Sequence, residues 1–381
     1  MHDDFGGVAV PRPRRGERLS EQSRGWLEQD RKKAGWSDKN VIRVGVIGYG
    51  YWGPNVVRNF HGLANCKLIA VCDKSPTAST RVLASYPGLE VTSDARDIFT
   101  SKAIDAVAIV TPVATHCELA RLCLENGKHV FVEKPFTATV AQAEELIELA
   151  EQKQLKIMVD HTFLFTGAVR KMKELIEQRV LGTLYYYDSV RVNLGLFQHD
   201  VNVIWDLAPH DFSIMDYLIA ERPAAVAATG AAHVNGLEDM AYVTIYFPND
   251  IIAHISVNWL SPVKVRTTLI GGEQRMLLWN DLAADEKIKI YDKGINTTGE
   301  QGVYNLLVSY RSGDMWAPKI DQTEALRVEA EYFVDCILHD KKPFNDGEAG
   351  LRVVRLLEAT SLSLKKHGAL IDLGGISLWP R

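Results

Sequence analysis

Short apolar runs alternate with amphipathic stretches from residue 42 to residue 163. The runs are rich in valine, isoleucine and alanine and have the length of buried strands. They occupy residues 43–47, 67–72, 104–110, 129–132 and 156–159, with helical patterns between them at 54–61, 76–85, 114–126 and 140–152. Thr139 and Gln142 form a capping-box pair at the start of the last helix. This alternation predicts a parallel sheet wound by crossover helices.

The pattern changes after residue 166. A helix is expected over residues 167–178, and polar and apolar residues then alternate in several runs. These runs are 184–192, 224–229, 240–247, 251–259, 264–270, 274–278 and 288–291. A period of two is typical of an antiparallel sheet covered on one face, and Pro248-Asn249-Asp250 marks a hairpin. Two helices, over 323–338 and 347–366, close an α/β chain of two domains, predicted as 41–163 and 164–381.

Composition narrows the class of protein. The 381 residues are 46% apolar with a formal charge of −5, which is typical of a globular chain and indicates neither a nucleic-acid nor a membrane partner. Residues 1–40 are charged and poor in apolar side chains, so we expect a poorly ordered extension with a short helix over 20–33. The five cysteines have no metal-ligand spacing. They indicate reduced thiols, no metal and a cytoplasmic home.

A glycine-rich turn, Gly48-Tyr49-Gly50-Tyr51-Trp52-Gly53, joins the first strand to the first helix. In such a turn the first glycine allows the bend, the second lets the backbone approach a pyrophosphate, and the third lets helix and strand pack closely. Asp73 ends the second strand, about twenty residues on, where a carboxylate would take the ribose hydroxyls. The sequence predicts a dinucleotide site that favours NAD, although Lys74 and Ser75 leave NADP open.

Glu133-Lys134-Pro135 follows the strand over residues 129–132. Pro135 has no N–H to donate, so the strand ladder ends there. The carboxyl ends of parallel strands form the edge where ligands bind, and the Lys134 ammonium could hydrogen-bond a substrate oxygen. A surface ion pair is the alternative for Lys134. Glu133 is interpreted as a structural or cofactor-supporting residue.

Two further strings carry polar groups. Thr111-Pro112-Val113-Ala114-Thr115-His116 ends another strand. It predicts a helix start, capped by Thr111 or Thr115, that also lines the cofactor groove. In Trp205-Asp206-Leu207-Ala208-Pro209-His210, Asp206 and His210 are four apart and share one face of a helical turn. An imidazole can act as base and acid near neutral pH, and a purely structural histidine is the alternative.

These three motifs, in this order and spacing, resemble the glucose–fructose oxidoreductase / inositol dehydrogenase (Gfo/Idh/MocA) family over residues 41–370. The resemblance implies a Rossmann domain followed by a domain whose open sheet covers the nicotinamide and often forms a dimer or tetramer, with the C-terminal helix packing back on the first domain. Lys134 would orient the reacting hydroxyl or carbonyl, in a Lys134-Pro135 peptide that is cis in some relatives. His210 would carry the hydroxyl proton, and Asp206 would support it or bind substrate.

The family acts mostly on sugars, cyclitols and nucleotide-linked sugars. Residues 161–165 and 191–195 resemble members that oxidise or reduce a nucleotide-linked hexose at C3, and an NAD(P)-dependent dehydrogenase or reductase of this kind is expected. Alternatives are a free-sugar or inositol dehydrogenase and a non-catalytic dinucleotide-binding regulator. Candidate substrate contacts are Arg191, Asn193 and Trp205, together with Lys264, Tyr187 and Phe197.

Overall fold

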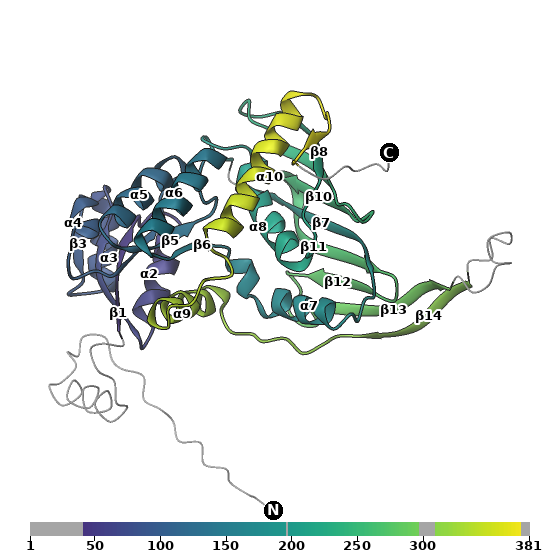
Figure 1. The fold of residues 1–381 in the computed structure, drawn as a ribbon, viewed down its shortest axis with the longest axis horizontal. Coiled ribbons are helices and arrows are strands. Elements are labelled where there is room, and N and C mark those ends of the chain that lie inside the picture. Colours follow the sequence, from purple (N-terminus) through teal and green to yellow (C-terminus); the bar gives the residue numbers. More distant parts are fainter. Residues whose placement is uncertain (1–40, 196, 297–308, 375–381) are drawn as a thin grey trace, which may run out of the picture. The chain divides into compact units, whose positions relative to one another are not determined.

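The computed structural model describes residues 41–195, 197–296 and 309–374 (Figure 1). The extension predicted for residues 1–40 lies outside these ranges. Within the described ranges, none of the helices is long and apolar enough to cross a membrane.

The first sheet has six strands in the order β3-β2-β1-β4-β5-β6, and every neighbouring pair is parallel. Its strands are β1 (Ile42–Ile47), β2 (Cys66–Cys72), β3 (Glu90–Thr92), β4 (Ala106–Ile109), β5 (His129–Glu133) and β6 (Ile157–Asp160). The connecting helices are α2 (Gly53–His61), α3 (Pro76–Ser85), α4 (Arg96–Phe99), α5 (His116–Glu125) and α6 (Val140–Lys153). The predicted doubly wound sheet is confirmed, although β3 and α4 were not predicted.

The winding direction reverses between β1 and β4. Open α/β sheets bind ligands in the crevice at this point, beyond the carboxyl ends of the strands. The crevice is bounded here by the loops that follow Ile47 and Ile109, and the Val110 N–H donates to the Ile47 carbonyl at 2.8 Å. The glycine-rich turn and the string at 111–116 therefore meet at one place.

The second sheet has nine strands in the order β14-β13-β12-β11-β7-β10-β9-β8-β15, and only the β7–β10 pair is parallel. The strands are β7 (Leu184–Leu194), β8 (Ala225–Ala231), β9 (Met240–Tyr246), β10 (Ile252–Asn258), β11 (Leu260–Gly272), β12 (Met276–Asn280), β13 (Ile288–Asn296), β14 (Ser309–Trp316) and β15 (Ile371–Asp372). The mainly antiparallel sheet is as predicted. Strands β14 and β15 were not predicted.

Side chains alternate cleanly between the two faces of this sheet. On one face Val243, Ile255 and Ile270 are buried. Helix α8 (Val203–Leu218) contacts β7, β9 and β10, α10 (Gly347–Lys365) contacts β8, and α7 (Gly167–Glu177) packs on α8. On the other face Val190 and Tyr242 align across β7, β10 and β9 and remain exposed. One covered and one open face is the arrangement that the period of two predicted.

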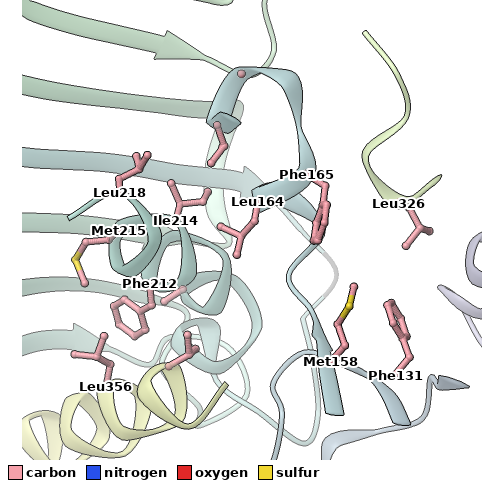
Figure 2. Close-up of a cluster of buried hydrophobic side chains, with 14 of the residues drawn as sticks. Phe131, Met158, Leu164, Phe165, Phe212, Ile214, Met215, Leu218, Leu326 and Leu356 are labelled. Carbon is pink, nitrogen blue, oxygen red and sulfur yellow. The ribbon is translucent and has the colours of Figure 1, made fainter. Parts of the chain in front are cut away.

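The apolar core runs without a break from the first sheet to the second (Figure 2). Phe131 of β5 and Met158 of β6 belong to the same cluster as Leu164 and Phe165 of the 3₁₀ turn η3 (Thr162–Phe165) and Phe212 of α8. Two helices near the C-terminal end of the chain also contribute side chains to this core. From α9 (Ala325–Leu338), the Phe333 ring packs edge-on against those of Phe60 and Phe131, with centroids 6.3 and 5.6 Å away.

Helix α10 packs on α6 in the first half of the chain. Arg355 forms an ion pair with Glu144 of α6 at 2.8 Å, and Glu358 accepts the Val140 N–H at 2.9 Å. The predicted capping-box pair at the start of α6 is present in part, because the Gln142 side chain bonds the residue before the N-cap. Thr139 accepts the Gln142 N–H at 3.3 Å, and the Gln142 side chain reaches back to the Ala138 N–H at 3.1 Å.

Candidate active site

The glycine-rich turn leaves room where a pyrophosphate would lie. Gly48 has φ +103°, and a Cβ there would overlap the Val110 carbonyl oxygen, so only glycine fits without strain. A Cβ on Gly50 would meet no atom of the described residues within 4 Å. Helix α2 then begins at Gly53 with no side-chain cap and no acidic residue in its first turn. Its free N–H groups and positive dipole end suit an anion, so these residues fit the phosphates of NAD.

Asp73 is fixed beside this turn. Its carboxylate accepts the Tyr49 N–H at 2.6 Å and the Ser75 N–H at 2.8 Å. Ser75 caps α3, accepting the Ala78 N–H, while Lys74 is exposed. Trp52 in the turn is half-buried, whereas Tyr51 is 90% exposed. These two bonds hold the carboxylate at the end of β2, beside the glycine-rich turn.

The string at 111–116 differs in part from its prediction. Thr115 occupies the N-cap position of α5, but its hydroxyl makes no capping bond and instead contacts the Thr111 hydroxyl at 2.7 Å. Pro112 is exposed. His116 is fully buried, and its two ring nitrogens lie 2.7 Å from the Thr111 carbonyl and 2.9 Å from the Pro135 carbonyl. His116 therefore ties the loop after β4 to the loop after β5 and does not line the groove.

Lys134 is held at the carboxyl end of β5, next to a cis Lys134-Pro135 peptide. Its Nζ donates to the Asp206 carbonyl at 2.8 Å and lies 3.8 Å from the Asp206 carboxylate. That carboxylate also accepts the indole N–H of Trp259 at 3.1 Å. In the same turn of α8, Pro209 interrupts the helical hydrogen bonds. The structure thus brings together the predicted lysine and aspartate.

His210 lies one turn beyond Asp206 on α8, in surroundings that keep its ring neutral. Burial, followed by the positive charges of Lys134 and Arg191, holds the pKa of His210 well below its ordinary value. Its Nδ1 is buried without a hydrogen-bond partner among the described residues. Its ring packs edge-on against Phe163, with centroids 4.9 Å apart. A neutral imidazole can accept a proton from a hydroxyl.

The candidate substrate contacts fall in other places than expected. Arg191 is 4% exposed, and its guanidinium binds Asp211 at 2.6 Å, so it forms a buried ion pair that fixes α8 to β7. The Trp205 indole donates to Ser361 of α10 at 2.9 Å, which is a packing contact. Tyr187 is buried in the core. Asn193 is half-buried near the end of β7, and Lys264 is exposed on β11. The Phe197 ring packs on Trp259, with centroids 5.6 Å apart.

Three buried carboxyl groups cluster beneath Lys134. Glu133 and Asp160 are paired in register at the ends of β5 and β6, and Glu329 comes from α9. Burial and then the charge of Asp160 raise the pKa of both glutamates well above its usual range. Asp160 accepts the Trp52 indole N–H at 3.3 Å, while Glu329 accepts from Asn345 at 3.2 Å. The raised pKa values mean that both glutamates keep their protons to higher pH than exposed glutamates do. The cluster does not form a metal-binding set within the described ranges.

Sequence reasoning missed Asp160, Trp259, Glu329 and Asn345. Asp160 could have been found, because it ends β6 at the same sheet edge as Lys134. The other three join the site from distant segments, and neither spacing nor residue type in the sequence marks them.

Comparison with known proteins agrees with this geometry. Residues 42–161 match the model of the Gfo/Idh/MocA oxidoreductase family with its NAD-binding Rossmann fold, and residues 169–277 match the model of the C-terminal domain of the same family. The chain belongs to the Gfo/Idh/MocA family. The Rossmann assignment and the expectation of an NAD-binding oxidoreductase are thereby confirmed.

Named relatives match along most of the chain. One is the UDP-N-acetylglucosamine 3-dehydrogenase of Acidithiobacillus ferrooxidans, 27% identical, with 82% of this chain and 94% of the relative covered. Another is the scyllo-inositol 2-dehydrogenase (NAD(+)) of Bacillus subtilis, 26% identical, with 80% and 86% covered. GenD2 from gentamicin A biosynthesis, solved with NAD, has a TM-score of 0.74 at 20% identity, over 88% of this chain and 97% of GenD2, and so shares the fold.

Proposed function

We propose that this protein is an NAD-dependent dehydrogenase or reductase that acts on a secondary alcohol or ketone of a sugar. The observation that carries the proposal is the pairing of a held ammonium, Lys134, with a neutral imidazole, His210, at the edge of the sheet that bears the glycine-rich turn. A protein that only sensed NAD would have no use for these two groups at that edge.

The two side chains divide the work. Lys134, positioned by Asp206, donates a hydrogen bond to the reacting oxygen and favours negative charge on it as the alcohol loses its proton. His210 takes that proton in oxidation and returns it in reduction. Nicotinamide, when bound, supplies the acceptor or donor of the hydride. Trp259 acts through Asp206, because its indole N–H fixes the carboxylate that lies beside Lys134.

We further propose a nucleotide-linked hexose, altered at C3, as the substrate. The support is the similarity to UDP-N-acetylglucosamine 3-dehydrogenase along 94% of that relative. Lys264 is exposed on β11 and can meet a diphosphate. Asn193 remains a proposed substrate contact. Because Arg191 and Trp205 are committed to Asp211 and Ser361, they are not part of this proposal.

The second candidate is an inositol dehydrogenase, favoured by relatives such as the Inositol 2-dehydrogenase of Rhizobium meliloti, 24% identical over 85% of this chain. Following NADH absorbance with UDP- and dTDP-hexoses, free hexoses and inositols separates the two. Turnover of the nucleotide-linked sugars alone supports our proposal, and turnover of inositols alone replaces it. NADH binding without turnover on any of them would leave a regulatory role.

We also propose that the open face of the second sheet joins a second copy of the chain. Val190, Tyr242, Ile252 and Leu269 lie on that face and are each 38–44% exposed. An apolar sheet face of this kind is costly to leave in water. A Tyr242→Lys variant should shift the mass measured by light scattering toward the monomer. The five free cysteines fit a reducing compartment and support the proposed cytoplasmic home.

A further inference from the structure

A cavity of about 190 Å³ lies behind the candidate active site, among η3, α7, the second half of α8 and the first turns of α10. Its lining includes one buried histidine, three cationic side chains and one carboxylate. These are His161, Lys173, Arg222, Arg352 and Asp216. The cavity is smaller than the roughly 300 Å³ at which pockets for drug-sized ligands begin. Only a small molecule or the end group of a larger one could enter it.

His161 lines this cavity with both ring nitrogens unsatisfied. The residue is 1% exposed, and neither nitrogen has a hydrogen-bond partner among the described residues. Burial lowers the pKa of His161 to about 4, so the ring is neutral at pH 7 and offers one N–H donor and one acceptor. A buried polar group without a partner is unfavourable, and most such groups in proteins are satisfied. A ligand in the cavity would supply the missing partner.

The charge of the lining favours an anion. Asp216 binds Arg222 at 2.9 Å and Arg352 at 2.9 Å, and Lys173 lies 3.6 Å from Glu177, just outside the lining. The three cationic side chains and these two carboxylates together carry a net charge of +1. Each guanidinium has five N–H donors, and Asp216 takes only part of them. Arg222 keeps a side chain that is 57% exposed at the mouth, where it can turn to an incoming ligand.

We propose that this cavity binds a phosphate group, carried by inorganic phosphate or by a small phosphate ester. Guanidinium groups match the geometry of phosphate oxygens with paired hydrogen bonds. The His161 N–H supplies one further hydrogen-bond donor. A dinucleotide is too large for the cavity, so the site is separate from the glycine-rich turn. The proposal goes beyond the proposed function, since it needs no turnover.

Two short connections join this cavity to the reacting groups. Ser213, in the lining, donates its hydroxyl to the His210 carbonyl at 2.9 Å. His161 directly follows Asp160, whose carboxylate accepts the Trp52 indole of the glycine-rich turn. A phosphate held by His161 would therefore bind the residue next to Asp160 of the carboxyl cluster.

The test is a calorimetric titration of inorganic phosphate into the full chain saturated with NAD, at constant ionic strength maintained with chloride. Saturation with NAD blocks the phosphate-binding turn. We expect one phosphate per chain, with the Kd raised at least tenfold in Arg222→Gln and in His161→Phe. Arg327→Gln is the matched control, because Arg327 is 53% exposed and pairs with Glu331 at 3.0 Å. The control should bind phosphate like the parent protein.

Repeating the titration with glycerol phosphate and a hexose phosphate identifies the source of the phosphate group. Equal affinities indicate the inorganic ion, and tighter binding of an ester indicates that ester. The proposal would be overturned if phosphate produced no more heat than chloride. It would also be overturned if Arg222→Gln and His161→Phe both bound phosphate as tightly as the parent protein. The Arg222 side chain is 57% exposed, so the Tm of Arg222→Gln without phosphate should match that of the parent and report an intact fold.

Discussion

The ammonium of Lys134 donates to the backbone carbonyl of Asp206 at 2.8 Å, across 72 positions of sequence. The contact joins the end of β5 in the first sheet to the first turn of α8 above the second. It therefore places the proposed substrate-orienting group and the helix that bears His210 in one fixed arrangement. Positioned groups of this kind account for much of the rate of an enzyme.

Replacing Lys134 by methionine keeps the length of the side chain and removes its charge. We expect kcat on the sugar substrate to fall about 100- to 1,000-fold, because the reacting oxygen loses its hydrogen-bond donor. Lys156→Met is the matched control. Lys156 is 18% exposed against 15% for Lys134, and it pairs with Asp340 away from the site. Equal rates in both variants, measured by NADH absorbance, would remove Lys134 from the mechanism.

The pH dependence of kcat/KM reports on His210. A base works above its pKa, and the pKa of His210 lies well below its ordinary value, about 6.5. Oxidation should therefore keep its rate below about pH 6.5, where an ordinary histidine is half protonated, and decline only in more acidic buffer. The Lys134 charge contributes to this lowered pKa, so Lys134→Met should move the acid limb to higher pH while His210→Asn should abolish it. A limb that stays in place in both variants would contradict the assignment.

Glu329→Gln tests the carboxyl cluster. The pKa of Glu329 is raised in the folded protein, so the folded chain keeps a proton that the unfolded chain releases above about pH 4.3. This stabilisation is complete below pH 4.3 and is lost as the pH rises toward the folded pKa. Glutamine imitates the protonated form. We expect the Tm of Glu329→Gln to exceed that of the parent by about 2 °C or more at pH 8.5 and to match it near pH 5.

The control for the carboxyl cluster is Glu331→Gln, an exposed position two residues along the same helix. Its Tm should follow the parent at both pH values. A parent-like Tm for Glu329→Gln at pH 8.5 would show that Glu329 is ionised in the folded protein.

Alanine substitutions at two glycines of the turn should have different effects. One should lower the stability of the fold, and the other should weaken NADH binding. Gly48→Ala forces a Cβ against the Val110 carbonyl and keeps a positive φ, so it should destabilise the fold by about 2 kcal/mol. Gly50→Ala adds a Cβ that meets no atom within 4 Å in the described part of the chain, and its Tm should equal that of the parent. Its Kd for NADH, measured by fluorescence, should rise about tenfold, since the pyrophosphate needs that space. Unchanged NADH affinity would place the cofactor elsewhere.

Asp73→Ser should alter the choice of cofactor. The Asp73 carboxylate repels the 2′-phosphate of NADP. Repulsion between like charges at close range costs enough binding free energy to make the site prefer NAD over NADP. Removing it, with Lys74 and Arg81 exposed nearby, should shift the ratio of kcat/KM for NADP against NAD about 10- to 100-fold toward NADP. If the ratio in Asp73→Ser equals that in the parent, Asp73 does not meet the ribose.

The alternation of strands and helices made the first half predictable. The helix α8 was only partly predicted, as a single turn, because it is apolar around most of its circumference and contains Pro209. A helix buried on all sides shows no 3.6-residue period. Strand β14 was not predicted, because Ser309–Trp316 is mostly polar.

The candidate site was predictable only where a motif lies at a strand end. Lys134, Asp73 and the glycine-rich turn follow this rule, since the edge of a parallel sheet is known once its strands are. Arg191 does not follow it, because its charge suggested a ligand while its partner, Asp211, is another residue of the core. Glu329 and Asn345 reach the carboxyl cluster through tertiary packing, on which their local sequence gives no information.

The late helices also bear on how the chain folds during synthesis. Phe333 covers Phe60 and Phe131, and the Asn345 side chain and backbone bond β6 through Val159 at 2.8 and 2.9 Å. The sheet that holds the cofactor thus receives its final apolar cover from residues translated near the end. While the ribosome is still making the second sheet, the emerging first half exposes aromatic surface. A polypeptide cut after residue 163 should accordingly bind chaperones or aggregate instead of folding alone.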